Sequence, residues 1–224
     1  QTGVDFVESN AECANQSRIV VLAVKPQYFD AVFSEIRDVV TPEQVVISLA
    51  PGVTISNITE RLGGNVRVVR AMPNTPAMLG EGMTGISCGE GSCTEEEKET
   101  VRDIFSSCGR VEMVEERLMD AVGCVSGSSP AFVYMFIEAL ADGGVEMGLS
   151  RDAALSLAAQ CLIGAGKMVL KTNTHPGILK DRVCSPGGGT IAGVHTLEEG
   201  KFRGVVMDAV VQSIRRMQNV GDKA

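Results

Sequence analysis

Short runs of β-branched apolar residues alternate with amphipathic stretches along the first half of the chain. A run that is apolar at successive positions is typical of a strand buried on both faces, and apolar residues spaced three to four apart predict a helix. These patterns predict strands near residues 18–24, 45–50, 66–71, 83–88 and 109–113. They predict helices between the strands, near residues 27–40, 55–62 and 94–108. Such alternation indicates a parallel sheet with right-handed crossovers.

The second half of the chain, from about residue 115, has almost only helical patterns. We expect helices over residues 150–170, 176–183, 190–199 and 202–219. The apolar residues of 130–170 surround the helices instead of forming one stripe, which indicates burial on every side. In so short a domain, burial of that kind usually needs a partner subunit. We therefore divide the chain into an α/β domain, residues 1–114, and a helical domain, residues 115–224.

Composition and charge exclude several classes of protein. With 28 acidic and 20 basic residues, the net charge is −8, and a nucleic-acid-binding protein needs a basic surface instead. The longest unbroken apolar run, residues 131–137, is far shorter than the ~20 residues that cross a bilayer, so we expect no membrane partner and no signal peptide. The seven cysteines include no C-x-x-C pair, which is typical of free thiols in a reducing cytoplasm. With two histidines, we expect no metal site.

One glycine motif has the form of a phosphate-binding loop but the wrong surroundings. Residues 80–85 match G-x-G-x-x-G. A dinucleotide fingerprint must follow a strand directly and open a helix. Here residues 72–79 separate the motif from the preceding strand, and no helical pattern follows it. We therefore interpret the motif as a turn.

Three turns that follow the first three predicted strands are stronger candidates for a binding site. They comprise Ala23, Val24, Lys25 and Pro26 after the first strand, Leu49, Ala50, Pro51 and Gly52 after the second, and residues 72–76 after the third. The carboxyl ends of parallel strands meet at one edge of a sheet, where open α/β sheets bind their ligands. Each turn alone is an ordinary connection, but three at one edge favour a crevice for a cofactor or substrate.

A glycine-rich loop in the helical half is a candidate anion site. The helix expected from Thr190 is preceded by Ser185, Pro186, Gly187, Gly188 and Gly189. Glycines let backbone amides approach a ligand, and a helix N-terminus favours an anion such as a carboxylate. The alternative is a simple turn in which Thr190 is the N-cap of the helix. Another segment, residues 126–130, lacks the spacing of a nucleophile motif and is better explained by close packing of a helix on the sheet.

In their order and spacing, these segments resemble the pyrroline-5-carboxylate reductase family, which carries out the last step of proline biosynthesis. The resemblance covers essentially all 224 residues. It is carried by residues 23–26, 69–77, 80–82, 120–121, 126–131, 175–177, 179–181 and 185–191. Ser129 and Gly189 replace the family's commoner residues. The strand, phosphate-binding glycine loop and helix with which family members begin are missing from the chain, so we expect an N-terminally incomplete Rossmann-type domain.

The resemblance implies an NAD(P)-binding Rossmann-type sheet followed by an all-α dimerisation and substrate domain. It implies a cytoplasmic homodimer, which in this family often assembles into decamers, and NADPH as the cofactor with NADH as the alternative. The cofactor-binding residues that it implies are Ala23, Val24, Lys25 and Pro26 beside the nicotinamide, Leu49, Ala50 and Pro51 on the next strand end, Asn10 near the ribose, and Glu116 at the cofactor's edge.

The resemblance also implies a substrate site and a reaction. The backbone amides of Ser185, Gly187, Gly188 and Gly189 hold the carboxylate of 1-pyrroline-5-carboxylate, and Thr190, the implied catalytic residue, hydrogen-bonds the ring nitrogen. Hydride transfer from NAD(P)H to the imine carbon gives L-proline. A protonated iminium is already electrophilic, so the reaction needs alignment and no covalent nucleophile.

Two alternatives stay open from the sequence. A β-hydroxyacid dehydrogenase shares the α/β-then-helical plan, and residues 164–167 faintly resemble its catalytic helix, but that class lacks the loop of residues 185–190. The second alternative is a truncated, catalytically weak or inactive reductase chain that acts only as an oligomerising module, because the phosphate-binding segment is missing.

Overall fold

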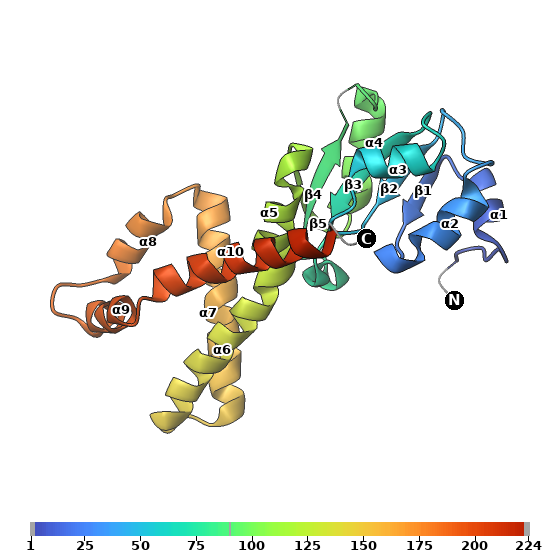
Figure 1. The fold of residues 1–224 in the computed structure, drawn as a ribbon. Helices are drawn as coiled ribbons and strands as arrows, with labels where there is room; N and C mark the ends of the chain where they lie inside the picture. Colours follow the sequence, from blue (N-terminus) through green and yellow to red (C-terminus); the bar gives the residue numbers. More distant parts are fainter. Residues whose placement is uncertain (1–2, 90, 222–224) are drawn as a thin grey trace. The chain divides into compact units, whose positions relative to one another are not determined.

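The computed structural model describes residues 3–89 and 91–221, which divide into two compact units (Figure 1). The first unit comprises Gln1–Ser128 together with Gln212–Ala224, and the second comprises Ser129–Val211. The helical half of the sequence therefore begins within the first unit, and residues 212–221 also belong to that unit.

A five-stranded sheet in the order β1-β2-β3-β4-β5 is the centre of the first unit. Its strands lie where the apolar runs predicted them: β1 (Ile19–Leu22), β2 (Val45–Ser48), β3 (Arg67–Met72), β4 (Gly82–Cys88) and β5 (Gly109–Met113). β1, β2 and β3 are parallel neighbours. Because side chains alternate between the faces of a strand, each β-branched run supplies apolar residues to both faces of the sheet. Val46 and Val68 lie in one apolar cluster, and Ile47 and Val69 lie in the other.

The sheet is mixed, and the prediction of a wholly parallel sheet was wrong for its second part. β4 is antiparallel to β3, and β5 is parallel to β4. Parallel neighbours need a crossover of about a dozen or more residues, usually a helix. Only the short 3₁₀-helix η2 (Thr75–Leu79) lies between β3 and β4, so β4 runs back along β3. β5 follows α4 (Glu95–Ser106) and has the expected crossover.

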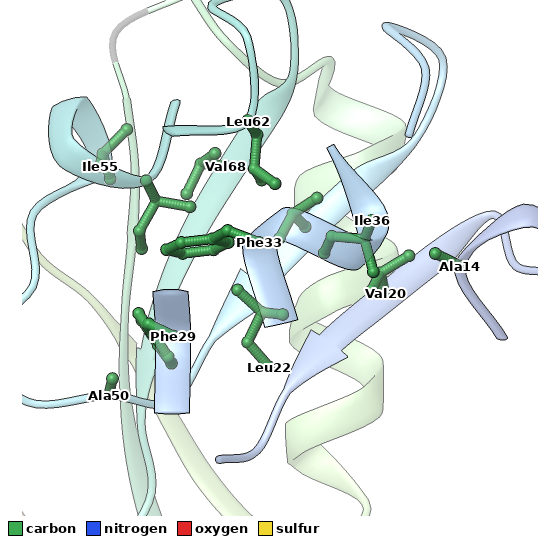
Figure 2. Close-up of a cluster of buried hydrophobic side chains, with 12 residues drawn as sticks. Ala14, Val20, Leu22, Phe29, Phe33, Ile36, Ala50, Ile55, Leu62 and Val68 are labelled. Atoms are coloured by element: carbon green, nitrogen blue, oxygen red, sulfur yellow. The ribbon is translucent and has the colours of Figure 1, made fainter. Parts of the chain in front are cut away.

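Helices cover both faces of the sheet. On one face, η1 (Pro26–Tyr28) leads into α2 (Phe29–Ile36), and α3 (Ile55–Arg61) lies beside it. Figure 2 shows their side chains converging with those of β1, and the rings of Phe29 and Phe33 meet edge to face at 4.9 Å. On the other face, α4 buries Val101 and Phe105. The helix α1 (Asn10–Asn15), which the apolar pattern did not predict, adds Ala14 to the first cluster.

The G-x-G-x-x-G motif does not open a helix, which agrees with its rejection as a phosphate-binding loop, but its interpretation as a turn holds only for Gly80 and Glu81, because residues 82–85 are the first part of β4. Gly80 ends η2 with a φ of 73°. A Cβ on Gly85 would lie 2.4 Å from Cγ1 of Val122, which belongs to α5 (Met119–Val122). Gly85 is therefore required for the close packing of α5 on β4.

Residues 116–128 form a helical segment whose pitch changes along its length. The 3₁₀-helix η3 (Glu116–Leu118) leads into α5, and α5 leads into the π-helix η4 (Gly123–Ser128). Asn74, in the link after β3, fixes the π-helix to the sheet. Its Nδ2 donates to the carbonyl of Ser126 at 2.9 Å, and its Oδ1 accepts the backbone N–H of Met83 at 2.9 Å. Segments of π-helix occur frequently at functional sites.

The second unit is helical. It contains α6 (Ser129–Glu146), α7 (Arg151–Thr172), α8 (Pro176–Val183), α9 (Gly189–Glu199) and residues 202–211 of α10 (Phe202–Gly221). Ser150 is the N-cap of α7, at the start of the range predicted for this helix. α6 and α7 pack through small side chains: Ala141, Ala154 and Ala158 are the only buried hydrophobic residues among the described residues of 129–211.

Two helical segments are long and apolar enough to cross a membrane by length and composition alone. They are Glu116–Glu146, with a mean hydropathy of 1.3, and Arg151–Thr172, with a mean hydropathy of 1.6. The prediction that no segment is long enough was wrong because it counted unbroken apolar runs. Isolated polar residues interrupt these segments without lowering their average hydropathy much. The core helices of soluble proteins pass the same test of length and composition.

Candidate active site

Three loops of the first unit lie at one edge of its sheet. β1, β2 and β3 are parallel, so the turns that follow them emerge at the same edge, which we call the carboxyl edge. The first turn exposes Ala23, Val24 and Lys25 and half-buries Pro26. In the second turn, Leu49 is half-buried, Ala50 is buried and Pro51 is exposed. The structure thus places seven of the predicted cofactor residues together at this edge.

Local sequence explains the shape of the first two turns. Lys25 is extended, as the residue before a proline prefers to be, and Pro26 begins η1. Gly52 has a φ of 75°, in the left-handed region that glycine adopts without strain. Thr54 then caps α3 by accepting the backbone N–H of Asn57 at 3.1 Å. These signals bend the chain sharply away from each strand and leave its backbone at the carboxyl edge.

Glu116 reaches the same edge from η3. Its Oε1 accepts the backbone N–H of Ile55, the first residue of α3, at 2.6 Å, and lies 3.3 Å from Nη1 of Arg70. Arg70 is on β3, and its side chain is 5 % exposed. Sequence reasoning did not find Arg70 or its link to Glu116. These residues lie 46 positions apart, and no local pattern connects them.

The environment of Arg70 is costly for a charged side chain. Nη2 of Arg70 lies 3.8 Å from Oδ1 of Asp120, which is too long for a hydrogen bond. Within the described part of the chain, Nε and Nη2 are buried without a hydrogen-bond partner. A buried polar group left unsatisfied costs about 1–3 kcal/mol, and more when it is charged. The carboxylates of Glu116 and Asp120 offset the charge but leave these donors unpaired.

Asn10 lies at the start of α1, where its Nδ2 donates to Oε2 of Glu35 on α2 at 3.0 Å. The preceding residue, Ser9, is the N-cap of this helix and accepts the backbone N–H of Glu12. The hydrogen bond of Asn10 thus ties α1 to α2. Its described contact is with α2 and not with the three turns.

The glycine-rich loop lies in the second unit and leads into α9. Gly187 has a φ of 68°. The backbone N–H of Gly188 donates to the carbonyl of Ser185 at 3.1 Å, and a Cβ on Gly188 would lie 2.3 Å from Oγ of Ser185. Position 187 favours glycine because of its φ, and at Gly188 an added Cβ would displace the Ser185 hydroxyl. The loop borders an open hollow of about 540 Å³, which is lined by Gly187, Gly188, Ile191, Ala192, Val194, His195 and Glu198.

The structure excludes one alternative for Thr190. The N-cap of α9 is Gly188, and Thr190 lies inside the first turn of the helix as an exposed residue. The hydroxyl of Thr190 is therefore not the N-cap that the alternative requires. The first backbone N–H groups of a helix have no partner within the helix, and the glycine cap supplies no side chain to satisfy them. This loop presents donors for an anion with a hydroxyl beside them.

Comparison with known proteins links both units to one family. Residues 116–220 match the model of pyrroline-5-carboxylate reductase dimerisation, and residues 1–52 match the model of NADP oxidoreductase, coenzyme F420-dependent. The chain is 46% identical to a pyrroline-5-carboxylate reductase of Glycine max, over 97% of this chain and 79% of the relative. A reductase of the same name from Methanosarcina acetivorans is 45% identical, over 99% of this chain and 82% of the relative.

A solved structure extends the similarity to three dimensions. The crystal structure of a Plasmodium falciparum pyrroline carboxylate reductase with NADP bound matches with a TM-score of 0.88 and 36% identity. The match covers 98% of this chain and 83% of that chain. The likeness therefore includes the sheet of the first unit and the helices of the second.

Proposed function

The chain belongs to the pyrroline-5-carboxylate reductase family, and on this premise we propose that it reduces 1-pyrroline-5-carboxylate to L-proline, the last step of proline biosynthesis. The observation that carries this proposal is the 46% identity to the Glycine max reductase, which extends over 97% of the chain. The chain is thus an NAD(P)H-dependent oxidoreductase. The family excludes the alternative of a β-hydroxyacid dehydrogenase.

The carboxyl edge is the part of the first unit that fits the cofactor. When bound, NADPH supplies a hydride from C4 of its nicotinamide. Ala23 and Val24 are small, exposed residues that leave room for a flat ring beside the end of β1. We assign cofactor binding to this turn together with Lys25, Pro26, Leu49, Ala50, Pro51 and Glu116, and to Asn10 near the ribose. The NADP-bound relative supports NADPH as the cofactor, with NADH as a second candidate.

The loop before α9 fits the substrate. Backbone N–H groups at a helix N-terminus favour a carboxylate, and in our assignment Ser185, Gly187, Gly188 and Gly189 hold the carboxylate of the substrate. Thr190 then holds the proton at the ring nitrogen, which keeps the imine carbon electrophilic. The chain supplies alignment and hydrogen bonds, and such positioning is a large part of what hydride transfer to an iminium requires. In this assignment residues 1–114 bind the cofactor, and residues 115–224 bind the substrate and dimerise.

The helical region makes the protein an oligomer. The match to the dimerisation model spans residues 116–220 and includes both membrane-length segments completely. A partner subunit therefore accounts for their apolar surfaces, and we assign the enzyme to the cytoplasm, without a membrane or nucleic-acid partner. Assembly of dimers into decamers is the further step that we propose. Sedimentation velocity in detergent-free buffer tests this: a stable species of about ten subunits supports the decamer, a dimer alone contradicts it, and a detergent-dependent particle contradicts the cytoplasmic assignment.

Direct assay tests the proposed reaction. The enzyme is expected to consume NADPH when 1-pyrroline-5-carboxylate is added, and chromatography is expected to find one L-proline per NADPH oxidised. NADPH oxidation without proline, or no oxidation at all, would contradict the proposal. As a control, the enzyme is given a β-hydroxyacid in place of 1-pyrroline-5-carboxylate and NADP in place of NADPH. No formation of NADPH is expected in this assay.

Thr190→Ala tests the role of the hydroxyl. Loss of a hydrogen bond that forms in the transition state is expected to lower turnover about 10–100-fold, which corresponds to about 1–3 kcal/mol. NADPH affinity is expected to change little. The matched control is Thr196→Ala on the same helix, where the hydroxyl donates to the carbonyl of Ala192 at 3.2 Å. Equal kinetics for both variants and the native enzyme would remove Thr190 from the mechanism.

A further inference from the structure

Arg70 lies at the centre of the sheet, where a charged side chain is least expected. Its neighbours in register are Ser48 on β2 and Ser87 on β4, and both serines are buried. Residues paired directly across strands project from the same face, so two small side chains flank the guanidinium. This face also carries Gly85, against which α5 packs. The row of small residues provides the space in which Arg70 lies beneath η3 and α5.

The contacts of Arg70 lead towards the carboxyl edge. Its Nη1 lies 3.3 Å from Oε1 of Glu116, and the same oxygen accepts the N–H of Ile55 at 2.6 Å. Within residues 3–89 and 91–221, both hydrogen bonds of Glu116 are made by Oε1, and the side chain is 32% exposed. Oε2 is therefore available to a bound molecule, while Oε1 is fixed by a buried cation and by the start of α3.

The unpaired donors of Arg70 indicate that stability alone does not explain this residue. Apolar residues of similar volume often replace a buried ion pair without loss of stability, and breaking such a pair is strongly destabilising. Positions where a fold tolerates an unsatisfied buried charge are commonly functional. Arg70 acts through Glu116, because its own side chain is too buried to contact a ligand.

From these contacts we infer that Arg70 is a positioning residue for the reduction, because it holds the Glu116 carboxylate and, through that carboxylate, the start of α3 at the carboxyl edge. Glu116 then presents Oε2 to the cofactor bound at the carboxyl edge. This inference rests on the proposed function, in which Glu116 contacts the cofactor. Loss of Arg70 frees Glu116 to leave Ile55, so both the placement of the carboxylate and the loop before α3 change.

Arg70→Met in the native, assembled enzyme tests the inference. The rate of a single turnover, expressed per NADPH-binding site at saturating NADPH, is expected to fall about 100-fold, the effect of misplacing reacting groups by about 1 Å. NADPH affinity, measured by fluorescence titration, is expected to weaken about tenfold, because Glu116 and the start of α3 lie at the carboxyl edge; a tenfold change is about 1.4 kcal/mol. A merely structural role lowers the number of folded sites and leaves the rate per site unchanged.

Arg67→Met is the matched control. Arg67 is on the same strand, and it pairs with Glu97 on α4, on the opposite face of the sheet from Arg70. This variant is expected to lose stability but to keep its rate per site and its NADPH affinity within about threefold, since changes away from the site mostly affect folding. If Arg70→Met and Arg67→Met give the same rate per site, the inference is wrong.

Two further variants keep the inference testable if Arg70→Met folds poorly. Arg70→Lys retains the charge without the planar fork, so an intermediate loss of rate is expected. The rate per site of Glu116→Gln is expected to equal that of Arg70→Met. The rate of the double variant is expected to lie within about twofold of the slower single variant, because the effects of residues that act as a unit do not add. Additive losses, or a rate for Arg70→Lys equal to that of the native enzyme, would overturn the inference.

The readouts separate this inference from the proposed function. If the native enzyme does not reduce 1-pyrroline-5-carboxylate, the proposed function fails, and the NADPH titration still decides whether Arg70 positions the carboxyl edge. If the native enzyme is active and the Arg70 variants match it in rate per site and in affinity, the inference alone fails.

Discussion

The two units differ in how much of their apolar surface one chain can bury. In the first unit, helices cover both faces of a sheet, and residues such as Phe29, Val68 and Ile86 are almost fully buried. In the second unit, the buried hydrophobic side chains within described residues 129–211 are three alanines. Large apolar residues of that unit, such as Tyr134, Leu157 and Val205, are each about 60% exposed in the single chain. The first unit buries large apolar side chains within one chain, whereas the second leaves most of its large apolar side chains exposed and needs another subunit to cover them.

Small residues explain the difference between the two cores. Ala141, Ala154 and Ala158 let α6 and α7 approach closely, but their side chains bury little apolar area. The larger side chains project outward from both helices. A pair of helices that is apolar on most faces is stable only when something covers the outer faces. The dimerisation model that matches residues 116–220 indicates a second copy as that cover.

A charge placed on the outer face of α7 is expected to have the largest effect. Leu157 is 61% exposed in the single chain, so Leu157→Glu is harmless unless a partner covers it. Burying an uncompensated charge costs about 3–5 kcal/mol, and a symmetric dimer buries it twice. We expect sedimentation velocity to show loss of the native oligomer and of much of the helical circular dichroism.

The control for this variant lies in the first unit. Ile104, on α4, is also a partly exposed apolar residue, and Ile104→Glu is expected to change stability by less than about 1 kcal/mol and to leave assembly intact. Equal tolerance of both substitutions would show that the outer face of α7 is free in solution.

Removal of a phenyl ring from each unit is expected to have the next largest effect. Phe33 is buried beside Phe29, so Phe33→Ala is expected to cost about 3–5 kcal/mol at every protein concentration. Phe136 packs on Phe202 with ring centroids 5.6 Å apart but is only half-buried in one chain. If a partner completes that core, the cost of Phe136→Ala depends on protein concentration.

The two tyrosines allow each unit to be followed separately. The chain has no tryptophan, Tyr28 lies in the first unit, and Tyr134 lies in the second. Urea unfolding is followed by fluorescence in backgrounds with Tyr134→Phe or Tyr28→Phe. A concentration-independent midpoint for Phe136→Ala would contradict the account.

The smallest expected effect concerns the first turn of α4, in the first unit. Thr94 and Glu97 form a capping box, in which each side chain accepts a backbone N–H of the other residue. Burial alone would raise the pKa of the Glu97 carboxyl, but the Thr94 backbone N–H and the Arg67 guanidinium outweigh it and hold that pKa below its usual value. The stabilisation by Glu97 is therefore complete above about pH 4.3, the unfolded-state pKa, and is lost as the pH falls through the lower folded-state pKa.

This pH dependence is measured by thermal unfolding between neutral and acidic pH. Glu97→Gln is expected to be less stable than the native protein at pH 7 and to approach it in acid. Thr94→Ala is expected to cost about 1 kcal/mol at pH 7, as for other lost N-caps. A stability difference between native protein and Glu97→Gln that does not shrink in acid would show that the carboxylate contributes nothing through its charge.

The sequence predicted the elements of the first unit because their patterns are local. Continuous β-branched runs indicated β1, β2 and β3, and the spacing of apolar residues indicated α2 and α4. The antiparallel direction of β4 was missed, because it depends on the short length of the link after β3. The prediction used only the general alternation of strands and helices and did not consider the length of this link. The π-helix at Gly123–Ser128 was also missed, since its hydrogen-bond spacing departs from the helical period that the apolar pattern detects.

The residues of the candidate site also fall into two groups: those that local sequence predicts and those that depend on long-range contacts. Pro26, Gly52 and Gly188 are visible in the sequence because each has a local backbone role. Arg70 and its contact with Glu116 were not visible, because the contact joins β3 to η3 across the fold. How each predicted site residue contacts its ligand remains a prediction that the kinetic variants test.

Hydrogen exchange measured at several protein concentrations tests the central claim most directly. Backbone amides of α6 and α7 are expected to lose protection as dilution dissociates the oligomer, while amides of β2 and β3 keep theirs, because β2 and β3 are buried within one chain. Mass detection after proteolysis reports both regions in the same sample. Full protection of α6 and α7 in a species with the mass of a single chain would contradict the account.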